Sequence, residues 1–182
     1  MKKKHIISGV LSLSLVLCMS VPAFAADVST AGGSGAVPIP LTVAAATFSV
    51  TVPTSLPINV DTDGNVTTAT NLKIVNNGHG AVKVTNMSVK GIEDWQIVSY
   101  DNANMVSEKV NAHKIAMAIN GDKTTADDTI TFSSTNFPKL DGANATNSDE
   151  LTITYNAKVP AQATTLDNVK VVEITFVIGW DA

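Results

Sequence analysis

The chain has 182 residues, of which twelve are lysine, none is arginine and sixteen are acidic, and its formal net charge is −4. Without arginine or a cluster of basic residues, the composition argues against specific nucleic-acid binding. The length suits one domain that follows a processed leader, and the 157 residues that remain after a leader of 25 are enough to bury a core.

The beginning of the chain has the three parts of a secretory signal peptide. Three lysines (Lys2–Lys4) precede an apolar run over residues 6–21, and Ala23-Phe24-Ala25 supplies the small residues that signal peptidase requires. A membrane helix needs about 20 uninterrupted apolar residues, whereas this run is shorter and ends at Pro22. We therefore predict that residues 1–25 are a cleaved signal peptide, and we expect no stable membrane span.

Cleavage would also remove Cys18, the only cysteine, so the mature protein would have neither a disulfide nor a thiol nucleophile. The alternative, a lipid attached to Cys18, is disfavoured because Leu17 stands where lipoprotein signals have a small residue. The leader contains three of the twelve lysines, which leaves nine lysines, sixteen acidic residues and a net charge of −7. These features are typical of an exported bacterial protein that is secreted or associated with the cell wall.

Residues 26–43 are predicted to form a flexible arm. A linker of small residues extends to Gly35. The arm then alternates four apolar residues with other types, at Val37, Ile39, Leu41 and Val43. Because Pro38 and Pro40 lie two positions apart, their missing N–H groups fall on the same edge, and the strand can pair only through its other edge. The arm is therefore either the first edge strand of its own domain or an assembly strand donated to a neighbouring copy.

Residues 44–182 predict a single all-β domain, because short apolar–polar alternations recur between Gly, Pro, Asn and Asp turns. The predicted strands lie at 48–52, 58–60, 72–74, 82–89, 95–100, 114–120, 129–132, 151–157 and 169–180. The last of them alternates most regularly, with Val172, Ile174, Phe176, Ile178 and Trp180 on one face, which predicts a strand central to the core. We expect an antiparallel β-sandwich of about nine or ten strands.

Two local features are expected within this domain. The segment Asp61–Asn65 has the composition of a turn in which Gly64 takes a positive φ. Val82 and Val84 have one parity along their strand, whereas Met87 and Val89 have the other. This change of phase predicts a β-bulge near Asn86.

The sequence offers little support for catalysis. The mature chain would contain two histidines, His79 in a turn and His113 before a strand, and it has neither an H-E-x-x-H nor a G-x-S-x-G motif. Asp61 and Asp63 suggest calcium, but an EF-hand loop needs a glycine and a glutamate at positions that this turn does not supply. We therefore predict no enzyme activity, no cofactor, and no catalytic or metal-binding residue.

The aromatic residues are few. Trp95, Tyr100, Tyr155 and Trp180 are candidates for a sugar-binding face, because flat rings stack on sugar rings. Their parity favours the core instead, since Trp180 continues the apolar row of the last strand and Trp95 shares a face with Ile97.

Several segments resemble secreted surface proteins of Gram-positive bacteria. They are the entry TVPTSLPINV, the hairpin IVNNGHGAVKV and the closing VEITFVIGW. The two tryptophan triplets, Trp95-Gln-Ile97 and Trp180-Asp-Ala182, are similar in arrangement to those of WxL-domain proteins, although neither contains the leucine. The plan is also similar to that of the TasA/camelysin fibre group. These resemblances imply association with the cell wall and exported β-sandwich subunits that join through an N-terminal strand.

We therefore expect a non-enzymatic structural protein of the bacterial surface or extracellular matrix, which forms a homo-oligomer through the arm. The alternatives are a module that binds the cell wall or another glycan and, third, a secreted hydrolase. Assembly requires an open apolar sheet edge, and glycan binding requires an exposed aromatic platform. A hydrolase requires a cleft in which histidine and acidic side chains converge.

Overall fold

The computed structural model describes residues 31, 39–143 and 148–181; the predicted signal peptide and Val37 lie outside them. The chain divides after Val43, and the strand-rich unit spans Ala44–Ala182. Its described regular elements are strands, apart from the short 3-10 helices η1 (Met105–Ser107) and η2 (Ser134–Asn136). The predicted all-β fold is confirmed, and its arrangement as a sandwich stays a prediction.

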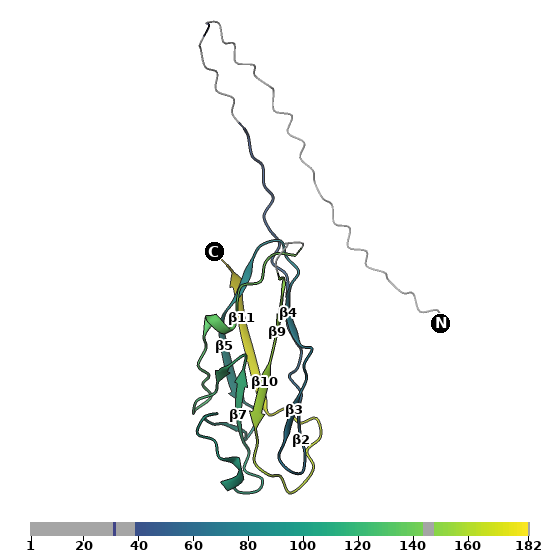
Figure 1. Ribbon diagram of the computed structural model, residues 1–182, viewed down its shortest axis with the longest axis vertical. Helices are drawn as coiled ribbons and strands as arrows, with labels where there is room; N and C mark the ends of the chain where they lie inside the picture. Colours follow the sequence, from purple (N-terminus) through teal and green to yellow (C-terminus); the bar gives the residue numbers. More distant parts are fainter. Residues whose placement is uncertain (1–30, 32–38, 144–147, 182) are drawn as a thin grey trace, which may run out of the picture. The chain divides into compact units, whose positions relative to one another are not determined.

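Eleven strands occur in the described part of the chain, somewhat more than predicted; Figure 1 labels most of them. They are β1 (Val50–Thr51), β2 (Ile58–Val60), β3 (Val66–Thr68), β4 (Lys73–Asn76), β5 (Val82–Gly91), β6 (Gln96–Ile97), β7 (Lys114–Ile119), β8 (Asp122–Lys123), β9 (Glu150–Thr152), β10 (Tyr155–Lys158) and β11 (Val172–Trp180). One sheet has the order β1–β4–β9, and a second has the order β10–β7–β6 with β8 also paired to β7. The strands β11 and β5 form a third sheet, and β2 and β3 form a fourth.

The expectation of antiparallel pairing fails at one place, because β6 and β7 pair in parallel. The chain between them, residues 98–113, includes η1 and is long enough to act as the crossover that parallel strands require. The predicted strand at 129–132 is also absent, and the structure has there only an isolated bridge between Thr124 and Ile130. A run of four residues is too short for its alternation to distinguish a strand from a loop that touches one.

One hydrophobic core receives side chains from three of the sheets. Its most buried large apolar residues are Ile74, Val82, Ile115, Met117, Ile119, Phe137 and Ile153. The segment 151–157 alternates as predicted, but it divides at Ile153 and Thr154 into β9, which pairs with β4, and β10, which pairs with β7. This segment therefore joins two sheets, and its inward side chains pack in the core that both share.

The predicted β-bulge is confirmed in the long pairing of β5 with β11, which Figure 1 shows side by side. Val177 lies opposite Asn86 and Ile178 lies opposite Val84, so Thr85 is the extra residue. Because of this extra residue, Val84 and Met87 both point into the core although their parities differ.

The turn between β2 and β3 forms as predicted, and Gly64 has a φ of +83°. Asp61 Oδ1 accepts hydrogen bonds from the backbone N–H groups of Asp63, at 2.9 Å, and Asn65, at 2.8 Å. Its Oδ2 accepts a third, from Asn65 Nδ2 at 2.8 Å. The side-chain bond from Asn65 is the main reason that the pKa of Asp61 is lowered. Both carboxylate oxygens are thus used within the turn.

Candidate assembly site

Three of the four predicted assembly residues lie in the described part of the chain, and all three are exposed. Ile39 is 90% exposed, Leu41 is 84% exposed and Val43 is 74% exposed, and none of them belongs to a strand. Isolated apolar residues are common on protein surfaces, whereas an alternating row is not. Burial of this row against another surface would remove apolar area from water.

The strand β11 was predicted to be central to the core, and this prediction is wrong, because its inward side chains are only partly buried against the core. Among the described residues β11 pairs with β5 alone, so it lies at an edge. Its inward row is correspondingly only partly buried, at Val172, Ile174, Phe176 and Ile178. Alternation showed which face points inward, but it is the same for an edge strand and for a central strand that has one face in solvent.

The pairing with β5 defines which backbone groups of β11 are free. The N–H of Ile92 bonds to the carbonyl of Val171, at 3.1 Å, and the N–H of Asp181 bonds to the carbonyl of Ala81, at 2.9 Å. In an antiparallel pair, every second residue of a strand directs both its N–H and its C=O to the partner strand, and the residues between them direct theirs to the opposite edge. With the observed register, odd-numbered residues of β11 therefore face β5, and even-numbered residues direct their backbone groups to the open edge.

The free edge and the inward face of β11 consequently belong to the same residues. Each even-numbered position from 172 to 180 combines an apolar side chain with backbone groups that point to the open edge. Native proteins usually shorten, charge or cover an edge of this length, because it is a template for another strand. Among the described residues, none covers this edge with a strand.

The two tryptophans behave differently. Trp95 is buried as predicted, with 7% exposure, and its ring stacks on His113 with a centroid distance of 5.1 Å. Trp180 was predicted to be in the core but is 40% exposed, because it is the last residue of the edge strand. Its ring meets the ring of Phe48 edge-on, with centroids 5.0 Å apart, and covers Gly80 closely. The exposed pair Phe48–Trp180 thus marks the C-terminal end of β11.

A charged pair stands beside this aromatic pair. Lys83 Nζ lies 2.8 Å from Asp181 Oδ1, and both side chains are about one-third exposed. The hydrogen bond from Lys83 is the main reason that the pKa of Asp181 is lowered. The pair joins β5 to the residue after β11 and so holds the end of this strand in place.

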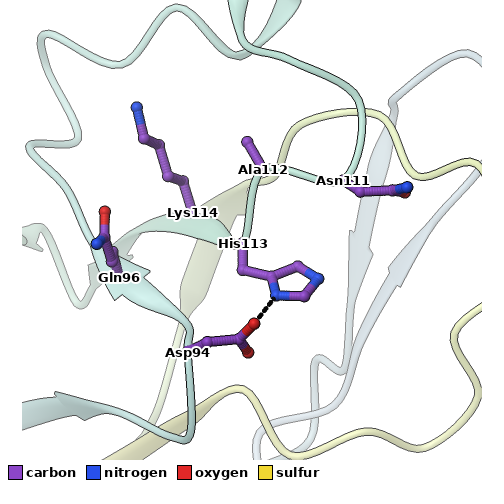
Figure 2. Close-up of a pocket in the computed structure, with 6 residues that line it drawn as sticks. All are labelled: Asp94, Gln96, Asn111, Ala112, His113 and Lys114. Carbon is purple, nitrogen blue, oxygen red and sulfur yellow. Dashed lines mark hydrogen bonds and ion pairs between the residues drawn. The ribbon is translucent and has the colours of Figure 1, made fainter.

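A second feature is the pair His113–Asp94, in which His113 Nδ1 lies 2.5 Å from Asp94 Oδ2. These two side chains line an open pocket of about 340 Å³ together with Gln96, Asn111, Ala112 and Lys114. Figure 2 shows the two side chains pointing toward each other. A triad needs a hydroxyl or thiol nucleophile next to the histidine, and the side chains that line this pocket include neither. The contact with Asp94 orients the imidazole that stacks on Trp95.

Two features are absent from the described residues. These residues hold no group of three or more His, Cys, Asp or Glu side chains that could bind a metal ion. Within the same residues, no helix has the length and apolar character needed to cross a bilayer.

Comparisons with known protein families, with curated proteins and with solved structures found no match for this chain. The site is therefore interpreted from its own geometry.

Proposed function

We propose that this protein is a secreted, non-enzymatic structural subunit of the bacterial surface or extracellular matrix, which assembles when its arm adds to the sheet edge of a neighbouring copy. The observation that carries the proposal is the exposed alternating row of Ile39, Leu41 and Val43 in a segment whose prolines block one edge. Such a segment pairs through a single edge and needs a surface for its apolar side chains.

The energies favour the addition of a whole strand over a local contact. Complete burial of an aliphatic side chain contributes about 1.5–3 kcal/mol, whereas ordering the backbone of each residue costs about 1–2 kcal/mol. Half of the residues in an alternating strand bury a side chain, so side-chain burial roughly offsets the ordering cost. Net affinity must therefore come from the main-chain hydrogen bonds of an edge long enough to pair the whole row.

The test compares the mature chain with a version that starts at Ala44, by light scattering over a concentration series. Assembly through the arm predicts that the mature chain grows into oligomers or fibres and that the truncated chain stays monomeric. Circular dichroism of the truncated chain checks that it remains folded. A mature chain that stays monomeric at high concentration, and merely loses melting temperature on truncation, would show that the arm is an internal strand.

A second candidate function is glycan binding, and the exposed pair Phe48–Trp180 favours it. Trp180 is 40% exposed and Phe48 is 45% exposed, so part of each ring is accessible to a sugar. The test is sedimentation of the protein with purified Gram-positive cell walls. A glycan module predicts co-sedimentation that Trp180→Ala abolishes and that the arm truncation leaves unchanged. A protein that only assembles predicts that any sedimentation is abolished by the arm truncation and is unchanged by Trp180→Ala.

A further inference from the structure

We infer that the open edge of β11 is the acceptor of the neighbour's arm and that the arm adds to it antiparallel. This inference rests on the proposed function, which leaves the acceptor edge unnamed. The acceptor is a surface of this same chain: the even-numbered backbone groups of β11 and the partly buried row Ile174, Phe176 and Ile178. The occupant is the segment 37–43 of a second copy.

The parity of the two strands matches only in antiparallel order. In the arm, the prolines occupy one edge, so the N–H groups on the other edge belong to the apolar residues Ile39, Leu41 and Val43. In β11, the free backbone groups also belong to the apolar residues. A hydrogen-bonded antiparallel pair joins two residues whose side chains point to the same face. Antiparallel addition therefore places both apolar rows on the core side.

Parallel addition fails by the same rule. In a parallel pair, each residue forms hydrogen bonds with two residues of the partner strand, and these two lie on either side of the residue directly opposite. The directly opposite residue has its side chain on the same face of the sheet, and the two hydrogen-bonded residues have theirs on the other face. An apolar arm residue would then stand opposite Glu173, Thr175 or Val177, which are exposed. The apolar row of the arm would lie in solvent, and the row of β11 would stay uncovered.

Connectivity disfavours addition of the arm to its own domain in this way. Phe48 is held against Trp180, so the chain enters the domain at the C-terminal end of β11. If Val37 stood opposite Trp180 in antiparallel order, Val43 would lie six residues, or about 20 Å, along the strand from that end. The five steps from Val43 to Phe48 span at most about 18 Å. The whole row could therefore pair with β11 of the same chain only if residues 44–47 doubled back and ran fully extended along the strand.

A parallel return to the chain's own β11 would reach, but the connection does not favour it. The arm would have to reverse direction within Ala44–Ala46, and tight reversals rely on Gly, Asn, Asp or Pro, none of which is present there. Parallel order would also put the apolar row on the wrong face. A second copy is the occupant that both arguments allow.

The decisive experiment measures amide hydrogen exchange of the unaltered mature chain, as dilute monomer and after assembly. We expect the amides of Ile174, Phe176 and Ile178 to exchange at least tenfold more slowly after assembly, because they gain partners at the open edge. The amides of Thr175 and Val177 already face β5 and serve as internal controls that are protected in both states. Assembly without added protection of the even-numbered amides would overturn the inference.

Cysteine crosslinking determines the direction, because a mature chain without Cys18 has no cysteine of its own. Two full-length mature variants are mixed, one with Leu41→Cys and the other with a cysteine on β11. Opposed Cα atoms in a hydrogen-bonded antiparallel pair lie about 5.5 Å apart, within the range for a disulfide. We expect at least tenfold more crosslinking to an even-numbered position than to Thr175→Cys or Val177→Cys.

Replacement of Leu41→Cys by Ile39→Cys should then move the preferred partner two residues toward Trp180, since antiparallel partners shift in opposite directions. A shift toward Val172, or preferred crosslinking to odd-numbered positions, would refute antiparallel addition. The two proposals fail separately. A parent chain that does not assemble at any concentration contradicts the proposed function, whereas assembly through another surface contradicts only the choice of β11.

Discussion

Replacement of Phe176 by alanine measures how deeply the inward row of β11 is buried in the monomer. The Phe176 ring lies 6.2 Å from the ring of Phe137, which is 1% exposed and also packs against Phe132. Truncation of a fully buried phenylalanine costs about 3–5 kcal/mol, and we expect this loss for Phe137→Ala. Phe176 is only partly buried, and its removal leaves a cavity open to water. The expected loss for Phe176→Ala is therefore about 2–3 kcal/mol.

The assay is urea unfolding at concentrations where light scattering shows only monomer, and the m-value should be the same for all variants. The matched control is Thr175→Ala, because Thr175 is exposed on the opposite face of β11 and should change stability by less than about 0.5 kcal/mol. A loss below about 1 kcal/mol for Phe176→Ala would show that the inward face is assigned wrongly. A loss as large as that of Phe137→Ala would show that β11 is buried like a central strand.

Four further predictions follow from single features. N-terminal sequencing of secreted protein should give Ala26, and an intact leader would contradict cleavage. Asp122→Ala should cost about 2–3 kcal/mol in urea unfolding, because the buried carboxylate accepts two hydrogen bonds from the loop after β8. Gly64→Ala should cost about 1–2 kcal/mol through its positive φ alone, since no atom lies within 4 Å of the added Cβ. Lys83 lowers the pKa of Asp181, so the ion pair contributes fully to folding stability above the ordinary aspartate pKa. This contribution disappears as the pH falls through the lowered pKa of Asp181. The melting temperature of Asp181→Asn should therefore fall less on acidification than that of the parent chain.

The features that the sequence predicted correctly depend on neighbouring residues. The bulge at Thr85 follows from a change of parity within eight residues, and the turn at Gly64 follows from five. The inward faces of β5 and β11 were likewise correct, because a strand's two faces are determined by its own alternation. Each of these features is determined by a few consecutive residues, so the sequence of that segment is enough to predict it.

The features that the sequence did not predict depend on distant partners. The edge position of β11, and therefore the exposure of Trp180, is decided by which strand lies beside it, and no residue of β11 encodes that neighbour. The turn after β7 is made by Asn120 and Gly121, with φ of 47° and 93°, and Asp122 is buried under the loop that its carboxylate binds. The Asn-Gly pair is a strong signal for such a turn and would have located it correctly.

In the proposed assembly, the arm and the open edge are two halves of one joint, and their geometry determines the form of the product. Each copy offers one arm and one acceptor edge, and these are different surfaces, so the contact is heterologous and repeats from copy to copy. A heterologous contact generates a filament unless its rotation closes a ring. Pro38 and Pro40 would face away from β11 in the joint, and an outer edge that lacks the N–H donors of these two residues pairs poorly with a further strand. The same prolines that restrict the arm to one partner would therefore oppose lateral growth, so that assembly proceeds in one dimension.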